Sequence, residues 1–466
     1  MKSLSIRGTL ASLSLSMLLS SLGTSIANVG LPTLAEAFSA SFQAVQWVVL
    51  AYLLSITALI VSVGRLGDLV GRRRLLLVGI AVFTVASILC ALAPNLWLLI
   101  AARALQGIGA ATMMALTMAL VSGAVPKEKM GGAMGVLGTM SAIGTSMGPT
   151  LGGLMIAHMG WQGIFLLNVP LGVLAMGLVW AFLPVDRHEM TSTRPGFDTL
   201  GTLVLVLTLS AYALAMTLGR GSFGPLNTAL LLVAVIGLIL FVFVEQTAAS
   251  PLVNLAMLRN PRLSCGFAMS TLVTSVVMAT LVVGPFYLSG ALGLSAASVG
   301  LVMSAGPLVA ALAGMPCGWL VDRWGAQCSS TVGLLVMLTG ACVLPAVPTS
   351  VGVPGYLIPL VVLTAGYALF QAANNTAVMA DISPQQRGVI SGVLGLSRNL
   401  GLITGASVMG AVFAFATAGG DILQAQPHAV AQGMRVTFAV AAVLIVVALV
   451  IGTLGQRDSR RPATSC

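Results

Sequence analysis

Charge is the property that this sequence most lacks. Only 7% of its 466 residues are Asp, Glu, Lys or Arg, whereas a soluble domain carries about 25%. Hydrophobic residues make up 58%, and the mean hydropathy is +1.05. A globular core cannot bury this much apolar surface, because a soluble protein keeps a polar exterior. The composition therefore excludes a soluble domain and predicts an all-α, polytopic integral membrane protein.

The sequence also lacks the patterns of a reactive centre. Its six cysteines lie mostly inside apolar runs without CxxC spacing, and its three histidines fall near loops. No nucleophile arrangement, phosphate-binding loop or separate output domain is visible, so we expect neither an enzyme nor a sensor, and no bound cofactor or metal. The net charge of +10 is spread over short loops, so nucleic acid is not an expected partner.

Long apolar runs are what the sequence has in abundance. A spanning helix needs about 20 apolar residues, and such runs recur along almost the whole chain. Fourteen spans are expected, at residues 9–31, 44–67, 74–93, 97–122, 131–156, 162–184, 197–219, 226–245, 263–288, 297–321, 328–347, 354–380, 388–416 and 432–455.

Positive charge orients these spans. Of the 21 Lys and Arg residues, Arg103 and Arg398 lie inside spans and only Arg220 and Arg435 fall on one face; all the others fall on the opposite face. Cytoplasmic loops carry the excess of Lys and Arg in membrane proteins. We therefore expect a multi-pass protein of a cell membrane, a bacterial inner membrane, with both termini in the cytoplasm.

Two segments of the chain recur at nearly the same offset. GRLGDLVG at 64–71 is echoed by GWLVDRWG at 318–325, 254 residues later, and the segment 135–153 is echoed by 392–410, 257 residues later. Parallel duplicated halves are a transporter architecture, with substrate bound near the midplane. The expected organisation is an N-terminal six-helix bundle at 1–184, a linker with two inserted helices at 185–262, a C-terminal six-helix bundle at 263–456 and a cytoplasmic tail at 457–466.

The stretch GRLGDLVGRRR at 64–74 concentrates charge and glycine in a cytoplasmic loop. Glycines permit close helix approach and a tight turn, and an aspartate there can cap a helix or pair with a cation. The arginines alternatively anchor the topology on lipid phosphates. With the matching residues of the second half, the predicted gate and conformational switch consists of Gly64, Asp68, Gly71, Arg72, Asp322 and Arg323.

Polar residues inside the spans are the candidates for a substrate pathway. Arg103 lies about seven residues inside the fourth span, where a buried arginine is costly without partners or water. Arg398 stands where the repeat has Ser141, so the duplicated scaffold does not require it. Amides in spans should face protein or a cavity rather than lipid, although interhelical hydrogen bonds explain them equally well. The candidate cavity residues are Asn28, Gln106, Gln371, Asn374, Asn375 and Arg398.

One span presents a smooth glycine face. Its residues Gly144, Gly148, Gly152 and Gly153 follow a four-residue spacing, and Pro149 removes a backbone donor and kinks the helix. Such a face permits tight packing that can still slide, which suits two rocking halves.

These motifs together resemble the major facilitator superfamily over essentially the whole chain. GRLGDLVGRRR is similar to its signature between the second and third helices, and LLIAARALQGIGAA at 98–111 to its fourth-helix motif. GTSMGPTLGG at 144–153 resembles the fifth-helix signature of antiporters. SIANVGLP at 25–32, QWVVLAYLL at 46–54 and FLLNVP at 165–170 resemble the fourteen-helix drug:proton antiporter branch.

This resemblance implies a monomeric transporter that exports small amphipathic drugs or toxic compounds by alternating access, with protons as the exchanged ion. It implies a role in proton coupling for Arg103. Asp68 and Asp381, which lie at the ends of spans, are further candidates for the coupling.

The sequence departs from this branch at one position. Its members usually carry an aspartate in the first helix where this chain has Gly23, and all eleven acids here fall in loops or near span ends. Three explanations stay open: coupling through end-of-helix acids such as Asp68, Asp322 or Asp381, a neutral or anionic substrate, or uncoupled facilitation. The alternative function is export or facilitation of one metabolite or organic anion on the same fold.

The gate hypothesis predicts the effect of Asp68→Asn. The substitution keeps the size of the side chain but removes its charge, so the protein should remain in the membrane while transport falls strongly. Membrane fractionation and a transport assay measure the two effects. Unchanged transport would remove Asp68 from the gate.

Overall fold

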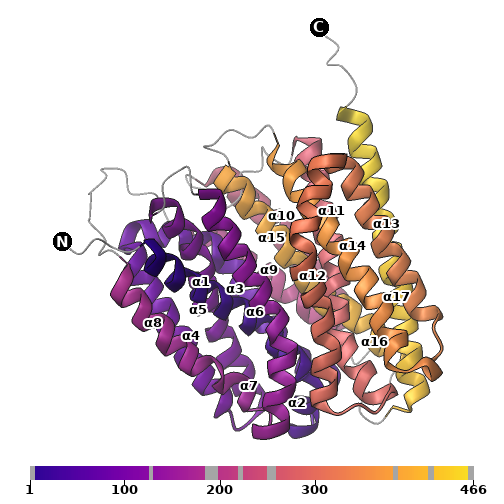
Figure 1. Cartoon of the computed structure of the whole chain (residues 1–466). Coiled ribbons are helices and arrows are strands. Elements are labelled where there is room, and N and C mark those ends of the chain that lie inside the picture. Colours follow the sequence, from indigo (N-terminus) through magenta and orange to yellow (C-terminus); the bar gives the residue numbers. More distant parts are fainter. Residues whose placement is uncertain are drawn as a thin grey trace. The chain divides into compact units, whose positions relative to one another are not determined.

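The computed structural model describes residues 6–124, 130–183, 198–218, 224–248, 259–380, 387–417 and 425–459. Within these ranges the chain is helical with short turns, and no strand occurs among the residues described. The all-α fold predicted from the composition is confirmed. Figure 1 shows the order of the helices along the chain.

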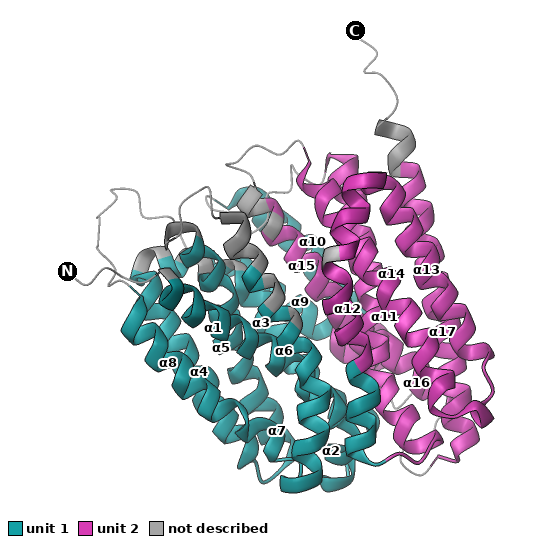
Figure 2. Cartoon of the chain, viewed as in Figure 1, with its two compact units in different colours: residues 1–212, 231–252, 295–304 teal, residues 213–230, 253–294, 305–466 magenta. Residues whose placement is uncertain are grey.

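The chain divides into two compact units, coloured separately in Figure 2. Unit 1 comprises residues 1–212, 231–252 and 295–304. Its helices are α1 (Ile6–Val29), α2 (Leu31–Ala37), α3 (Phe42–Val70), α4 (Arg72–Ala91), α5 (Leu96–Ala124), α6 (Met130–Met159), α7 (Gly163–Leu166), α8 (Asn168–Phe182), most of α9 (Thr199–Thr217) and most of α10 (Pro225–Thr247).

Unit 2 comprises residues 213–230, 253–294 and 305–466. Its elements are α11 (Pro261–Phe286), the π-helical turn η3 (Tyr287–Ala291), most of α12 (Ala296–Trp324), α13 (Ala326–Ala346), the short η4 (Thr349–Val351), α14 (Val353–Met379), α15 (Arg387–Thr404), the π-helical turn η5 (Gly405–Met409), α16 (Gly410–Ala416) and α17 (Pro427–Ser459).

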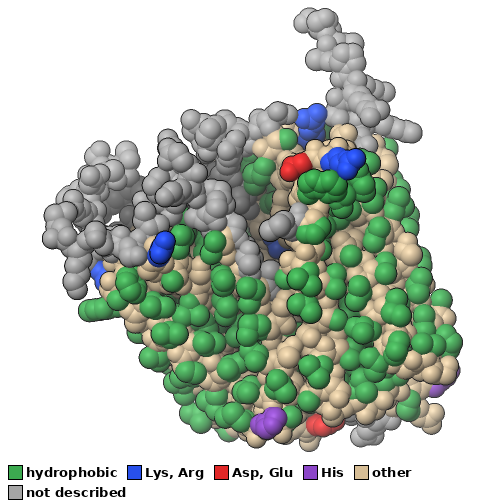
Figure 3. Space-filling view, in the orientation of Figure 1, with side chains coloured by type: hydrophobic (Ala, Val, Ile, Leu, Met, Phe, Trp, Pro, Cys, Tyr) green, Lys and Arg blue, Asp and Glu red, His purple; other side chains and the backbone are tan. Residues whose placement is uncertain are grey.

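Hydropathy predicts these helices closely. Thirteen helices within the described residues are long and apolar enough to cross a membrane, and α6 coincides with the remaining expected span, 131–156. On the face seen in Figure 3, hydrophobic side chains cover the middle of both units. Many of them are large and exposed, such as Trp180 and Leu312 at 72% and 70%. Exposed hydrophobic side chains in the middle of each unit are expected where the protein surface contacts lipid.

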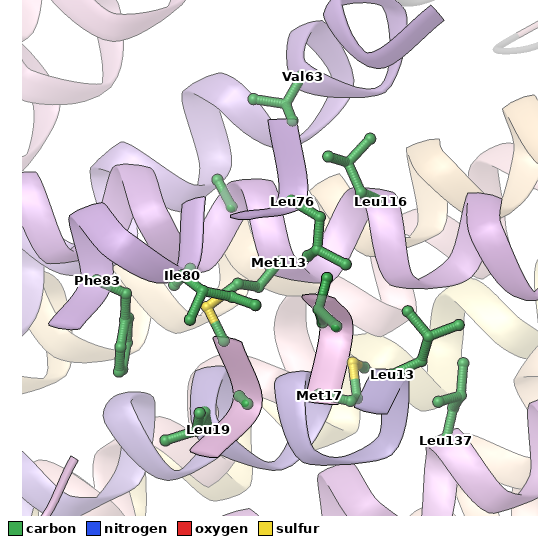
Figure 4. Packing of buried hydrophobic residues seen from close by; sticks show 14 of the residues in the cluster. Leu13, Met17, Leu19, Val63, Leu76, Ile80, Phe83, Met113, Leu116 and Leu137 are labelled. Atoms are coloured by element: carbon green, nitrogen blue, oxygen red, sulfur yellow. The ribbon is translucent and has the colours of Figure 1, made fainter. Parts of the chain in front are cut away.

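The core of unit 1 lies where α1, α4 and α5 meet. Figure 4 shows side chains from these helices pointing toward one another, joined by Val63 of α3 and Leu137 of α6. Leu13, Leu76 and Ile80 are completely buried there. Because lipid tails are as apolar as these side chains, the core is held by close packing more than by exclusion from water.

The same glycine turn occurs in both units. Gly71, between α3 and α4, has φ of 103°, and Gly325, between α12 and α13, has φ of 80°. Side chains other than glycine rarely adopt such angles. The two residues are separated by the offset of 254 found in the sequence repeat, so the repeated motifs build equivalent turns.

A helix crossing is also duplicated, atom for atom. A Cβ built on Gly109 of α5 would lie 2.6 Å from Phe83 N and 2.7 Å from Gly79 O of α4. In unit 2, a Cβ on Gly366 of α14 would lie 2.5 Å from Met337 N and 2.7 Å from Gly333 O of α13. The offsets of the repeat relate these residues, which supports duplicated halves.

This crossing predicts the cost of an added methyl group. Gly366→Ala forces α13 and α14 apart, and overpacking of this kind costs about 1–3 kcal/mol. We expect a lower midpoint of thermal unfolding for the detergent-purified protein. Gly314→Ala is the control, because a Cβ at Gly314 of α12 meets no atom within 4 Å. Equal midpoints for the two variants would contradict the close crossing.

Candidate functional site

Arg103, on α5 in unit 1, is the largest fully buried side chain among the described residues. Its side chain is completely buried, although it lies within a candidate membrane span. Its Nε donates to Val48 O of α3 at 2.8 Å, and its Nη2 donates to Gly23 O of α1 at 3.2 Å. Its Nη1 donates to Gln106 Oε1, one turn further along α5. The guanidinium therefore ties α1, α3 and α5 together.

Two aromatic rings and a hydrogen bond made by Gln106 complete the enclosure of the Arg103 guanidinium. The Arg103 guanidinium carbon lies 4.1 Å from the centre of the Tyr52 ring and 5.9 Å from that of Phe165. Aromatic faces attract cations at these distances. Gln106 Nε2 donates to Ser87 Oγ of α4 at 2.7 Å, which fixes the amide oxygen toward Arg103. Three segments that carry the family resemblance, 46–54, 98–111 and 165–170, thus meet at one buried charge.

The partners of Arg103 within the described residues are all neutral. They are two backbone carbonyls and one amide, so the positive charge is satisfied by hydrogen bonds without a carboxylate. A side chain at position 23 would meet the outer ends of two aromatic side chains. A Cβ there would lie 2.9 Å from the Tyr52 hydroxyl oxygen and 3.1 Å from the Phe83 ring.

Two of the predicted cavity residues are buried in unit 1. Gln106 is completely buried and holds Arg103. Asn28 is 1% exposed, and its Nδ2 donates within α1 to Thr24 O at 3.0 Å. Both amides face protein in this structure, so hydrogen bonding between and within helices accounts for their contacts.

Only part of the predicted gate lies among the residues whose surroundings the structure describes. Gly64 and Asp68 lie outside that set, as does the coupling candidate Asp381. Arg72 Nη1 donates to Ala119 O of α5 at 3.1 Å, which links the motif to the end of that helix. Asp322 is exposed.

Arg323 is exposed as well and stacks on Trp319, with its guanidinium carbon 5.3 Å from the ring centre. Neither Asp322 nor Arg323 forms an ion pair among the side chains that are described. A latch made by these two residues stays a prediction.

The glycines of α6 pack against two different neighbours. Gly144, Gly148 and Gly152 face α1, where a Cβ would lie within about 3 Å of Leu18 O, Ser25 and Val29 respectively. Gly153 faces the first turns of α12, which belong to unit 1; its Cβ would lie 2.7 Å from Ala296 O. The carbonyl of Pro149 approaches Gly300 in the same contact. The predicted single face is thus divided between two contacts.

In unit 2 the predicted cavity residues lie on α14 and α15. Asn374 is buried and its Nδ2 donates to Gly266 O of α11 at 3.1 Å. Gln371 and Asn375 are half-buried, and Arg398 is exposed. With its amide oxygen turned toward α15, Gln371 accepts from Arg398 Nη1 and Nη2 at 3.1 and 2.8 Å.

Sequence reasoning missed a carboxylate pair at the inserted helices. Glu245 of α10 is 3% exposed, and Asp198 caps α9 by accepting from Gly201 N at 2.7 Å. One oxygen of each carboxylate lies within 3 Å of the same point, the Cβ position of Gly201. Glycine at 201 is the signal that both acids share a small space, but only the structure brings α9 and α10 together.

Helices of spanning length, an apolar exterior and duplicated helix crossings define a polytopic membrane protein with two related halves. The family model of the Major Facilitator Superfamily matches residues 13–406. The chain belongs to this superfamily, whose members are membrane transporters of small molecules rather than enzymes.

Curated relatives match most of the chain. The riboflavin transporter RibZ of Clostridioides difficile (strain 630) is 33% identical over 404 residues, which cover 85% of this chain and 86% of RibZ. Multidrug resistance protein Stp of Mycobacterium tuberculosis (strain CDC 1551 / Oshkosh) is 31% identical over 409 residues, covering 87% and 75% of the two chains. Drug efflux pump JefA of the same strain is 33% identical over 395 residues, covering 84% and 77%.

Solved structures share the fold over nearly their full length. A bacterial homolog of the human lysosomal transporter Spinster, in an inward-facing and occupied conformation, has a TM-score of 0.68 at 17% identity, with 98% of each chain covered. The xylose transporter XylE from E. coli has a TM-score of 0.65 at 13% identity, with 99% of each chain covered. These similarities establish the fold.

The contacts of Arg103 predict that a substitution which keeps the charge but changes the shape of the side chain lowers stability and transport. Lysine in place of Arg103 cannot reach Val48 O, Gly23 O and Gln106 together, and each hydrogen bond to a charged group contributes about 1.5–3 kcal/mol. Arg103→Lys should lower both the thermal midpoint and transport. Arg7→Lys, at an exposed position of α1, is the matched control. If Arg103→Lys transports like the wild type, the site requires only a positive charge and not the three hydrogen bonds of the guanidinium.

Proposed function

We infer that this chain is an efflux transporter that exports small amphipathic molecules by alternating access, in exchange for protons. The observation that carries this proposal is the extent of the similarity to Stp and JefA. Both are described as drug-resistance or efflux proteins, and both match more than four fifths of this chain at 31–33% identity.

The packing of α6 supports alternating access. Its glycines bring it against α1 on one side and against the first turns of α12 on the other. Pro149 lies between these contacts and has no N–H for the helical hydrogen bond. Smooth contacts beside a break in the hydrogen bonding let a helix bend and slide without losing interlocked side chains.

Proton coupling needs a group that gains and loses a proton during the cycle. Arg103 is the coupling candidate that the family resemblance supplies, with Asp68 and Asp381 at span ends. Helix α1 contains no Asp or Glu, so it supplies no carboxylate to pair with Arg103. The protein therefore relies on acids at helix ends for coupling, and Arg103 influences them through the helices it holds.

The second candidate function is export or facilitated transport of one metabolite or organic anion. Two observations favour it. RibZ, a relative of similar identity, is described as a riboflavin transporter, and an acid is missing from the first helix at Gly23. A transporter without an acid on its first helix is better suited to neutral or anionic solutes than to cations.

The proposal includes the setting of the protein. It is a monomer in a bacterial inner membrane, with both termini in the cytoplasm and six-helix bundles at 1–184 and 263–456 flanking the inserted pair. The concentration of Lys and Arg on one set of loops supports this orientation.

The first experiment compares solutes of different charge. Cells that produce the protein and cells that lack it are loaded with ethidium, chlorhexidine or salicylate, and accumulation is followed with and without an uncoupler. We expect lower accumulation of at least one solute in producing cells, and loss of that difference when the uncoupler is added. The identity of the exported solute distinguishes a cation exporter from an anion exporter.

Cells that produce the Asp68→Asn variant at equal membrane level serve as the control for nonspecific effects of expression. Export that persists in full after the proton gradient is dissipated would overturn proton exchange and favour facilitation. Equal accumulation of all three solutes in producing and control cells would overturn the proposed export.

A further inference from the structure

Arg398 differs from Arg103 in that its side chain is exposed. It lies on α15 within the candidate membrane span Gly392–Ala416, yet its side chain is exposed. A charged side chain is costly against hydrocarbon and faces water or protein in membrane helices. The face of α15 that carries Arg398 therefore meets a polar space.

Neighbouring side chains hold the guanidinium in place. Gln371 of α14 accepts from both terminal nitrogens of Arg398 with one amide oxygen, and its Nε2 donates to the Tyr367 hydroxyl at 2.8 Å. Tyr367 and Gln371 are four residues apart and lie on the same side of α14. This chain of hydrogen bonds orients Arg398 without neutralising it.

Room is available beside the guanidinium. Gly395 lies three residues before Arg398 on the same side of α15, and a Cβ built there meets no atom within 4 Å; the same holds for Gly392. By contrast, Gly401 and Gly405 are packed against α11, where a Cβ would lie within 3 Å of Thr274 and Ser275. The turns of α15 before Arg398 are therefore open beside these glycines, whereas the turns after it are packed against α11.

The site carries positive charge only. Within the described side chains, no carboxylate contacts Arg398; its guanidinium donates to the neutral amide of Gln371, which in turn donates to the neutral Tyr367 hydroxyl. A guanidinium has five N–H donors, of which two are used on Gln371. The remaining donors match the paired oxygens of a carboxylate or phosphate.

The repeat shows that the scaffold does not need this arginine. The equivalent residue of unit 1 is Ser141, whose hydroxyl lies 2.7 Å from that of Ser21 on α1. A small hydroxyl is sufficient to join the helices at that place. Arg398 is therefore a feature of the second half alone, added on a face that has room for a ligand.

We propose that Tyr367, Gln371 and Arg398 form a binding site for the anionic group of a transported solute, a carboxylate or phosphate on an amphipathic molecule. This inference rests on the proposed transport function and names the substrate class. The same anionic oxygens occur on lipid headgroups, so the test separates the two sources.

The test uses two dyes with the same xanthene ring system and opposite charge, anionic fluorescein and cationic rhodamine 123. Transport is measured in proteoliposomes of phosphatidylcholine and in others that contain phosphatidylglycerol. Binding of fluorescein to the purified protein is followed by fluorescence anisotropy. Wild type is compared with Arg398→Gln, Arg398→Lys and the control Arg259→Gln, which removes an exposed arginine elsewhere in unit 2.

We expect Arg398→Gln to weaken fluorescein binding and transport by roughly tenfold or more, because a hydrogen-bonded charge is lost. Rhodamine 123 transport should stay within about twofold of wild type, since the cation does not use the site. Arg398→Lys should retain part of the fluorescein transport, and Arg259→Gln all of it. Similar thermal midpoints for the variants exclude misfolding as the cause.

Three results would overturn the inference. If Arg398→Gln lowers transport of both dyes equally, Arg398 is a positioning residue without a ligand of its own. If wild type moves rhodamine 123 but not fluorescein, transport stands and the anion site does not. If phosphatidylglycerol abolishes fluorescein binding, the site belongs to a lipid headgroup. A wild-type protein that moves neither dye would contradict the proposed transport function itself.

Discussion

The burial of the Arg103 charge constrains the arrangement of unit 1. Moving an ion out of water costs several kcal/mol even after the protein relaxes, so the surrounding helices must return that energy as hydrogen bonds. Val48 O and Gly23 O can do so only if α3 and α1 approach α5 closely. Gly107 permits this approach, because a Cβ there would lie 2.6 Å from Tyr52 O. The buried charge of Arg103 therefore depends on a glycine at position 107, which lets α3 and α5 approach closely.

Close approach is also what joins helices elsewhere in the chain. Lipid offers no hydrophobic drive for association, so small residues and polar contacts must supply it. The duplicated crossing of α4 with α5 and of α13 with α14 meets this need in both units. The units depart from each other where α6 contains Pro149 and the equivalent helix has the π-helical turn Gly405–Met409. Both interrupt regular hydrogen bonding at the same place, by different means.

Sequence alone predicted the spans well because bilayer thickness fixes their length, and the fourteen expected ranges match helices within a few residues at most ends. It also identified Arg103 as a buried arginine and the α6 glycines as a packing surface, whereas it assigned Gln106 to a cavity. It could not identify Ser87 or Phe165 as neighbours of this site, because helices that are apolar on every side have no pattern that fixes their rotation. The burial of Glu245 was missed for a related reason: its position near a span end was clear, but its neighbour Asp198 comes from another helix.

The two intramembrane arginines have different surroundings in the two halves of the duplicated scaffold. Arg103 donates to three acceptors on three helices, and its enclosure leaves no path for a solute. Arg398 contacts one neighbouring helix through Gln371 and stands beside two glycines that leave space. The first arrangement makes a charge structural, because moving it would break contacts among three helices at once. The second leaves donors and room, so selection for a solute can act on α14 and α15 without disturbing the crossings that hold either unit together.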